Sequence, residues 1–492
     1  MIGSLVVIAA AALLQDAPCA ALKTLSLPHI TITSVEFVSA GTSVPGAGRG
    51  DQAAALPAHC RVSATLTPTG DSHIEMELWL PTETWNGKFL AVGNGAWAGT
   101  IQTAALAAGV RRGYATASND TGHKGGSASF AVGHPEKLID FGSRAMHEMA
   151  VQSKAMMQAL YRRPAQRSYY QGCSTGGRQG MMEAQRFPED FDAIIAGAPV
   201  YNMVHLNVSQ VALQVEMLKD TARLVPPAKV SLLAAAVMTA CDQRDGVKDG
   251  IVSEPRACKF DPGVLACKAG DAADCLTPAQ VESARRAYAP VSDGGAIVYP
   301  GRSPGFETGW RIPTPGAALN PLFADMVRFV GRQDPNWNQS TFDLRTDLAL
   351  ALKNGAVVEA SDPDLSRFKA RGGKLLLYHG WADPGPAPEN TINYVEAVSA
   401  RLGGAQDDWM RLFLMPGVGH CGGGVGPDQA DFLGALERWR ESGTSPARIT
   451  ASRPGRSTQP PMSRPLCPYP QVARYTGAGS IDDEKNFACV GP

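Results

Sequence analysis

Hydrophobic and polar positions divide the chain into two regular stretches with an irregular one between them. The first regular stretch holds apolar runs typical of β-strands, over residues 30–38 and 60–66 and in "HIEMELWLP", "GKFLAVGNGAWAG", "RGYATASND" and "FDAIIAGAP". A helix-like segment over residues 144–161 lies among them. Strands that alternate with helices predict a mainly parallel sheet covered on both faces.

The middle stretch, residues 201–371, is rich in proline, glycine and cysteine and has no clear period, which indicates an inserted lid domain. The sheet resumes in "GKLLLYHGWADP" and "WMRLFLMPGVGHCGGG", two buried-strand runs separated by a helix-like segment over residues 390–401. We therefore predict a catalytic domain made of residues 19–200 and 372–492, interrupted by the lid.

The N-terminus carries an apolar run from Leu5 to Leu14 that is too short to span a bilayer and has the length of a signal-peptide core. Its first residues lack the usual Lys or Arg. We predict a signal peptide over residues 1–18 and a mature chain that begins just before Cys19. The mature protein is then expected to be secreted or periplasmic, with no membrane association after cleavage.

Charge and cysteine content narrow the choice of partners. The chain has 45 basic and 46 acidic residues and a formal net charge of −1, so we expect no nucleic-acid partner. Ten cysteines in an exported chain predict a disulfide framework, and the absence of a CxxC spacing argues against a zinc ribbon or a thioredoxin-like site. Cys267 and Cys275 flank a polar loop and Cys467 and Cys489 bracket the C-terminal tail, which suits local pairs, but the sequence alone leaves the connectivity open.

The stretch "SYYQGCSTGGRQGMMEAQRF" places Ser174 between two glycines, after a β-prone run and before a helix-prone one. This strand–turn–helix context is typical of a serine nucleophile, and Gly172 and Gly176 permit the tight turn. The same spacing recurs around Ser303, but Pro304 follows it and has no backbone N–H to lend to an oxyanion hole. We predict Ser174 as the nucleophile and Ser303 as a turn residue.

Two further polar residues follow the two strands that resume after the lid. Asp383 and His420 lie in the loops at the carboxyl ends of these strands, where α/β sheets place their sites. The order Ser174, Asp383, His420 is that of α/β-hydrolase triads. The alternatives are that Asp383 is a turn residue before proline and that His420 is an ordinary loop histidine. Other histidines fit the role of general base less well: His123, His147, His205 and His379, the last as a structural neighbour of Asp383.

Three motifs together resemble the tannase/feruloyl esterase family, which includes the mono(2-hydroxyethyl) terephthalate hydrolases: "GCSTGGR" from Gly172, "HGWAD" from His379 and "GHC" from Gly419. The resemblance covers nearly the whole mature chain. It implies an α/β-hydrolase fold with a large inserted lid domain and hydrolysis of esters of aromatic acids. It also implies a Ser174–His420–Asp383 triad. The oxyanion donors it implies are the N–H groups of Thr175 and, in the loop Gly93-Asn94-Gly95, of Gly95.

The resemblance explains why a cysteine precedes the serine. In the family a disulfide joins the cysteine before the nucleophile to the one after the histidine, which here implies Cys173–Cys421. An oxidised Cys173 cannot act as a nucleophile. The further pairs implied by the family are Cys19–Cys60, Cys241–Cys258, Cys267–Cys275 and Cys467–Cys489.

Within the lid, "CDQRDGVKDGIV" concentrates three aspartates around two glycines. Carboxylates at this density need a cation or bulk water to offset their repulsion, and oxygen ligands favour Ca²⁺. The family resemblance implies a structural calcium site with these ligands: the side chains of Asp242, Asp245 and Asp249 and the carbonyls of Val247 and Ile251. The spacing alone leaves a solvated acidic turn open as the alternative.

The predicted function is that of a secreted serine esterase. Its substrate would be a small aromatic ester such as a feruloyl or galloyl ester, free or attached to a plant polysaccharide or polyphenol. The alternatives are a terephthalate monoester hydrolase, a general carboxylesterase and a catalytically inactive calcium-binding module. Lid residues that could contact such a substrate, or form only lid core, are Trp310, Phe323, Phe329, Trp337 and Phe342, with Arg328 or Arg332 for a substrate carboxylate.

Overall fold

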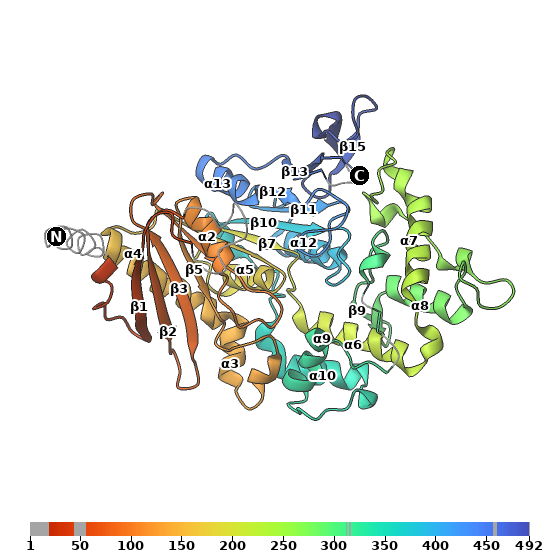
Figure 1. Cartoon of the computed structure of the whole chain (residues 1–492), viewed down its shortest axis with the longest axis horizontal. Coiled ribbons are helices and arrows are strands. Elements are labelled where there is room, and N and C mark those ends of the chain that lie inside the picture. Colours follow the sequence, from red (N-terminus) through yellow and green to blue (C-terminus); the bar gives the residue numbers. More distant parts are fainter. Residues whose placement is uncertain (1–18, 44–55, 311, 314–315, 456–459, 492) are drawn as a thin grey trace, which may run out of the picture. The chain divides into compact units, whose positions relative to one another are not determined.

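A computed structural model describes residues 19–43, 56–310, 312–313, 316–455 and 460–491 (Figure 1). The predicted signal peptide lies outside these described residues. The chain forms two compact units, one ending at Ile194 and the other beginning at Ile195. The division falls inside strand β7 (Ala193–Gly197).

The first unit contains six neighbouring strands of a larger sheet, in the order β1-β2-β3-β5-β4-β6. Its strands are β1 (Ile30–Val38), β2 (His59–Leu66), β3 (Ile74–Pro81), β4 (Lys88–Val92), β5 (Ala115–Asn119) and β6 (Arg167–Cys173). β4 pairs in parallel with β5 and β6, whereas β1, β2, β3 and β5 pair antiparallel in turn. The sheet is therefore mixed, and the expectation of a mainly parallel sheet is wrong for this unit.

The burial of the strands explains the mixture. All five residues of β5 are buried, which suits a strand covered on both faces, whereas β1 alternates between exposed positions and positions that are partly or fully buried. An antiparallel edge can leave one face to solvent, and Figure 1 shows β1, β2 and β3 running side by side at this edge. The helices of the unit are α2 (Thr103–Arg111), α3 (Pro135–Ile139), α4 (Ala145–Tyr161) and α5 (Thr175–Arg186).

The second unit contains the parallel strands that resume after the lid. β10 (Lys374–Gly380) pairs in parallel with β11 (Met410–Met415), and α12 (Pro388–Leu402) connects them. This is a β–α–β crossover, as the sequence predicts. The C-terminal elements are α13 (Phe432–Ser442) and two small antiparallel sheets made of β12 (Gln429–Ala430), β13 (Ile449–Arg453) and β14 (Met462–Leu466), and of β15 (Val472–Tyr475) and β16 (Phe487–Val490).

The predicted lid segment is more regular than its sequence pattern indicates. It holds the helices α6 (Met203–Lys219), α7 (Pro227–Cys241), α8 (Pro278–Tyr288), α9 (Pro321–Asp325), α10 (Leu344–Gly355) and α11 (Ser366–Ala370) and the hairpin β8 (Val291–Asp293) and β9 (Ala296–Tyr299). Figure 1 shows α6, α9 and α10 next to one another. No helix in the described part of the chain is long and apolar enough to cross a membrane.

Candidate active site

Ser174 lies at a sharp turn between β6 and α5, the strand–turn–helix context that the sequence predicts. Its backbone adopts φ 64° and ψ −123°, a strained conformation for a residue with a side chain. Neither flanking glycine could carry a side chain without a clash with neighbouring backbone. A Cβ on Gly172 would lie 2.6 Å from the backbone of Gly176, and a Cβ on Gly176 would lie 2.8 Å from the carbonyl oxygen of Asn94. This local geometry is that of a nucleophile elbow.

The glycine-rich loop that follows β4 packs against this elbow. Thr175 Oγ1 donates a hydrogen bond to the carbonyl oxygen of Ala96 at 2.8 Å, and the backbone N–H of Asn94 donates to Gln179 Oε1 at 2.9 Å. Gly95 lies between these two anchored loop residues. Because Thr175 is the first residue of α5, its backbone N–H has no partner within the helix. The two predicted oxyanion donors therefore belong to one tightly packed part of the first unit.

Asp383 and His420 meet in the second unit, beyond the carboxyl ends of β10 and β11. His420 Nδ1 lies 2.6 Å from Asp383 Oδ2, which is a short hydrogen bond. The side chain of Asp383 is buried, whereas that of His420 is 33% exposed. The backbone holds the carboxylate as well, because the N–H of Gly385 donates to Asp383 Oδ1 at 2.9 Å.

A second histidine contacts the same carboxylate. His379 Nε2 lies 3.1 Å from Asp383 Oδ2. Burial disfavours the charged form of Asp383, but hydrogen bonds from His379 and His420 outweigh burial and hold the pKa of Asp383 below its ordinary value. Asp383 is therefore ionised at neutral pH and can orient a protonated imidazole.

The predicted site residues thus fall into two groups. Ser174, Thr175 and Gly95 lie together in the first unit, and Asp383 and His420 are hydrogen-bonded in the second. The first group supplies a strained serine beside candidate N–H donors. The second supplies an imidazole that a buried carboxylate orients. These are the parts that a serine nucleophile and its general base require.

The family described as "Tannase and feruloyl esterase" matches residues 60–490. The chain belongs to the tannase and feruloyl esterase family. An uncharacterized esterase of Xanthomonas campestris pv. campestris is 38% identical, with 99% of this chain and 93% of that protein covered. Mono(2-hydroxyethyl) terephthalate hydrolase of Piscinibacter sakaiensis is 34% identical, and the match covers 89% of this chain and 86% of that protein. The crystal structure of feruloyl esterase B from Aspergillus oryzae is similar with a TM-score of 0.89 at 29% identity, and 96% of this chain and 100% of that chain are covered.

These similarities confirm two of the predictions. The protein is a carboxylic ester hydrolase, and its fold is that of the α/β-hydrolase esterases. The alternative of an inactive calcium-binding module therefore has no support from the relatives.

The acidic loop of this esterase follows α7 and folds back on itself. Asp242 Oδ1 accepts hydrogen bonds from the backbone N–H groups of Asp249 and Gly250, at 3.2 and 3.0 Å. Burial raises the pKa of Asp249, the neighbouring charges of Asp245 and Asp242 add to the rise, and an ion pair with Arg464 at 2.6 Å opposes it. The three carboxylates are therefore close enough to repel one another.

The donor chemistry of this loop suits calcium, because all its candidate ligands are oxygens. The backbone N–H groups of Val247 and Ile251 donate to Asp245 Oδ1 and Asp249 Oδ1, at 3.0 and 3.1 Å, so both predicted carbonyl ligands belong to the same folded loop. Across the described residues, no three His, Cys, Asp or Glu side chains converge as a ready-made metal set. The calcium site thus stays a prediction that rests on donor type.

All ten cysteines of the esterase are disulfide-bonded. Four predicted pairs are confirmed: Cys19–Cys60, Cys241–Cys258, Cys267–Cys275 and Cys467–Cys489. Cys173 and Cys421 are bonded as well, as the predicted bridge beside the serine requires. Their pairing with each other stays a prediction. A cysteine nucleophile at position 173 is excluded, because a disulfide sulfur has no thiolate to attack with.

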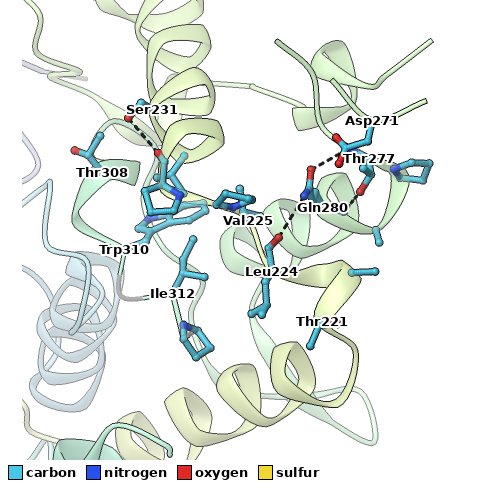
Figure 2. Close-up of a pocket in the computed structure, with 17 residues that line it drawn as sticks. Thr221, Leu224, Val225, Ser231, Asp271, Thr277, Gln280, Thr308, Trp310 and Ile312 are labelled. Atoms are coloured by element: carbon cyan, nitrogen blue, oxygen red, sulfur yellow. Dashed lines mark hydrogen bonds between the residues drawn. The ribbon is translucent and has the colours of Figure 1, made fainter. Parts of the chain in front are cut away.

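A cavity of about 1040 Å³ opens in the lid segment of the second unit (Figure 2). In Figure 2, Trp310 and Ile312 lie on one side of it and Gln280 and Asp271 on the other. Arg302 contacts both Trp310, which lines the cavity, and the loop that carries Asp383. Its guanidinium lies 5.6 Å from the Trp310 ring centroid, and its Nε donates to the carbonyl oxygen of Pro384 at 3.2 Å.

The other lid residues considered for substrate contact have different surroundings. Phe323 and Trp337 are buried and contribute to the lid core. Arg332 Nε lies 2.5 Å from Asp347 Oδ1, so this arginine is used within the lid. Arg328 packs beside Phe329, and its Nε is buried without a hydrogen-bond partner among the described residues.

Proposed function

We propose that this esterase hydrolyses esters of phenolic aromatic acids through an acyl-enzyme formed on Ser174, with His420 as general base and Asp383 as its orienting carboxylate. The observation that carries the proposal is the strained elbow at Ser174, together with the 2.6 Å hydrogen bond between His420 and the buried Asp383. Both occur at the sequence positions that the family resemblance assigns to a triad. The similarity to feruloyl esterase B supports a feruloyl-type acyl group.

In the proposed mechanism, His420 Nε2 takes the proton of Ser174 as Oγ attacks the ester carbonyl carbon. The negative charge that develops on the carbonyl oxygen is stabilised by the backbone N–H groups of Thr175 and Gly95. Collapse of the tetrahedral intermediate breaks the ester C–O bond, and His420 returns the proton to the leaving alcohol. Water, activated by His420, then hydrolyses the acyl-enzyme to the free acid and restores the Ser174 hydroxyl.

The acyl specificity is proposed from lid chemistry. Trp310 lines the lid cavity, and Arg302 links it to the carbonyl oxygen of Pro384, the residue after Asp383, so we propose that the Trp310 ring stacks on the phenolic ring of the acyl group. Of the two lid arginines considered for a substrate carboxylate, Arg332 already pairs with Asp347, whereas Arg328 has a buried Nε without a hydrogen-bond partner among the described residues. That second feature, with the similarity to mono(2-hydroxyethyl) terephthalate hydrolase, keeps a terephthalate monoester as the second candidate.

A turnover panel tests these candidates. The substrates are methyl ferulate, methyl gallate, mono(2-hydroxyethyl) terephthalate and, for general esterase activity, 4-nitrophenyl acetate. We expect kcat/KM for a phenolic acid ester to exceed that for the terephthalate monoester by about tenfold or more, equivalent to at least 1.4 kcal/mol of transition-state binding. The reverse ranking would identify the terephthalate monoester as the substrate class. Equal values across all four would indicate a general carboxylesterase.

We also propose that the acidic loop binds a structural Ca²⁺ ion through Asp242, Asp245, Asp249 and the carbonyls of Val247 and Ile251. A cation would offset the mutual repulsion of the three carboxylates. Binding to the folded chain alone would stabilise it by mass action. No step of the proposed hydrolysis passes through the ion.

Removal of calcium is expected to lower the melting temperature. With calcium at about 100 times its dissociation constant the ion would contribute about 2.7 kcal/mol, so chelation or Asp245→Ala should lower the Tm of a chain of this length by about 3 °C. The measurement is calorimetry with and without chelator, beside metal analysis of the purified protein. Asp407→Ala, which removes an exposed carboxylate outside the loop, is the matched control and should leave Tm unchanged. A chelator-insensitive Tm with no stoichiometric calcium would favour the solvated turn.

We also propose that the esterase is exported from the cytosol. The signal-like N-terminus and the complete oxidation of the cysteines both suit an oxidising compartment outside the cytosol. The substrate would then be met outside the cell, free or attached to a plant polysaccharide or polyphenol.

A further inference from the structure

Both ring nitrogens of His379 have hydrogen-bond partners inside the second unit, and one of these partners is the Asp383 carboxylate. The residue is fully buried. Its Nε2 lies 3.1 Å from Asp383 Oδ2 and 3.1 Å from the carbonyl oxygen of Pro386, and its Nδ1 lies 2.8 Å from Thr391 Oγ1. The same Oδ2 atom accepts the hydrogen bond of His420. One carboxylate oxygen therefore joins two histidines.

The chemistry of these partners decides which nitrogen of His379 carries the proton. A backbone carbonyl such as that of Pro386 can only accept a hydrogen bond, and an ionised Asp383 can only accept as well. Nε2 must therefore be the donor to both. The Thr391 hydroxyl can donate to the lone pair of Nδ1, so the neutral Nε2–H form satisfies every polar atom of the ring.

We propose that His379 is a positioning residue of this esterase: its Nε2–H fixes the Asp383 carboxylate in the orientation that His420 needs and shares its charge. Thr391, in the first turn of α12, fixes the tautomer that makes this possible. The inference rests on the proposed triad. It assigns His379 a role in how that triad works, beyond its place as a neighbour of Asp383.

The surroundings of Asp383 make this donor important. The carboxylate is buried, and the titratable groups that interact with it are His379 on β10, His420 after β11 and the buried hydroxyl of Tyr299 on β9. Burial alone would favour the protonated acid. The two histidine hydrogen bonds reverse that preference and lower the pKa of Asp383, so the loss of either bond should make protonation easier.

Two variants separate donation from mere packing. His379→Gln keeps an N–H group near the position of Nε2, whereas His379→Met fills a similar volume with no donor. In His379→Met, the Asp383 carboxylate would lose a hydrogen bond that offsets its negative charge, so the hydrogen-bonded Asp383–His420 pair should take up a proton at higher pH. The acid limb of the kcat/KM profile should therefore move upward by about one pH unit, with kcat about 10- to 100-fold lower. His379→Gln should restore the position of the acid limb.

The matched control is His147→Gln. His147 also bonds a buried carboxylate, with Nδ1 2.6 Å from Asp190 Oδ2, but it lies on α4 in the other unit. It should lower thermal stability without moving the acid limb. A folded His379→Met protein whose acid limb coincides with that of the wild type would overturn the proposal.

A second measurement keeps the proposal testable if His379→Met does not fold. Nitrogen-15 spectra of histidine-labelled wild-type protein should show a neutral Nε2–H signal that disappears in His379→Gln and changes in Thr391→Val. An Nδ1–H signal for His379 would refute the proposed role. The failure of the proposed function would look different, because hydrolysis would then survive in Ser174→Ala whatever the His379 variants do.

Discussion

Replacing Ser174 with alanine is expected to lower kcat for ester hydrolysis by about 10⁶-fold, because the loss of a triad nucleophile removes nearly all of the chemistry. The fold should survive. The turn is enforced by the close packing of Gly172 and Gly176 against neighbouring backbone, and the substitution removes only a hydroxyl from it. The measurement is steady-state turnover of the best substrate of the panel, beside circular dichroism and Tm.

Ser303→Ala is the matched control. Ser303 has the same Gly-x-Ser-x-Gly spacing, but it lies in an irregular part of the lid segment, outside any helix or strand, and Pro304 follows it. Its replacement should leave kcat and KM unchanged. Near-normal turnover by Ser174→Ala would show that another residue is the nucleophile and would remove the basis of the proposed mechanism.

The strands could be predicted from sequence because short apolar runs with turn residues at their ends have few other structures open to them. The runs over residues 30–38 and from Lys374 correspond to β1 and β10. The direction of pairing could not be predicted in the same way. β3 pairs antiparallel with β5 because the tertiary fold brings these two strands together, and the sequence of neither strand determines its partner.

The lid helices were missed for a different reason. Twelve of the 17 residues of α6 are buried, among them Asn207, Gln210 and Gln214. Because polar residues are buried here too, they do not mark a solvent-exposed face, and the sequence shows no apolar stripe at helical spacing. For α8 a signal was present. Thr277 and Gln280 form a capping box, and Pro278 occupies the first turn, which together mark a helix start.

The sequence predicts the site residues that belong to a local motif, but not the contacts that depend on how separate elements pack together. The serine between two glycines, and the Asp383 and His420 loops, follow from residue type and position. Nothing in the sequence shows that Thr391 bonds His379, or that the guanidinium of Arg178 is buried against the backbone oxygens of Phe141 and Gly142. Such contacts join separate elements, so they depend on the tertiary fold.

The double substitution Cys173→Ala with Cys421→Ala is expected to lower kcat by about 10²-fold at temperatures where the protein is still folded. If the two cysteines pair as the family implies, the bridge would hold the immediate neighbours of Ser174 and His420 within about 7 Å, Cα to Cα. A displacement of about 1 Å between a nucleophile and its base can cost about 10²-fold in rate. The chain-entropy contribution of so long a loop is about 5 kcal/mol, so Tm should fall as well.

The matched control is Cys467→Ala with Cys489→Ala, which removes a disulfide that links residues only 22 positions apart in the C-terminal segment. That variant should lose stability but keep its kcat, measured below its own melting transition. The comparison separates positioning from stability, because both variants lose a disulfide and only one would lose the link beside the serine. Full activity in the folded Cys173/Cys421 variant would mean that the rest of the fold alone positions the nucleophile and its base, and that the cysteine beside Ser174 contributes only to stability.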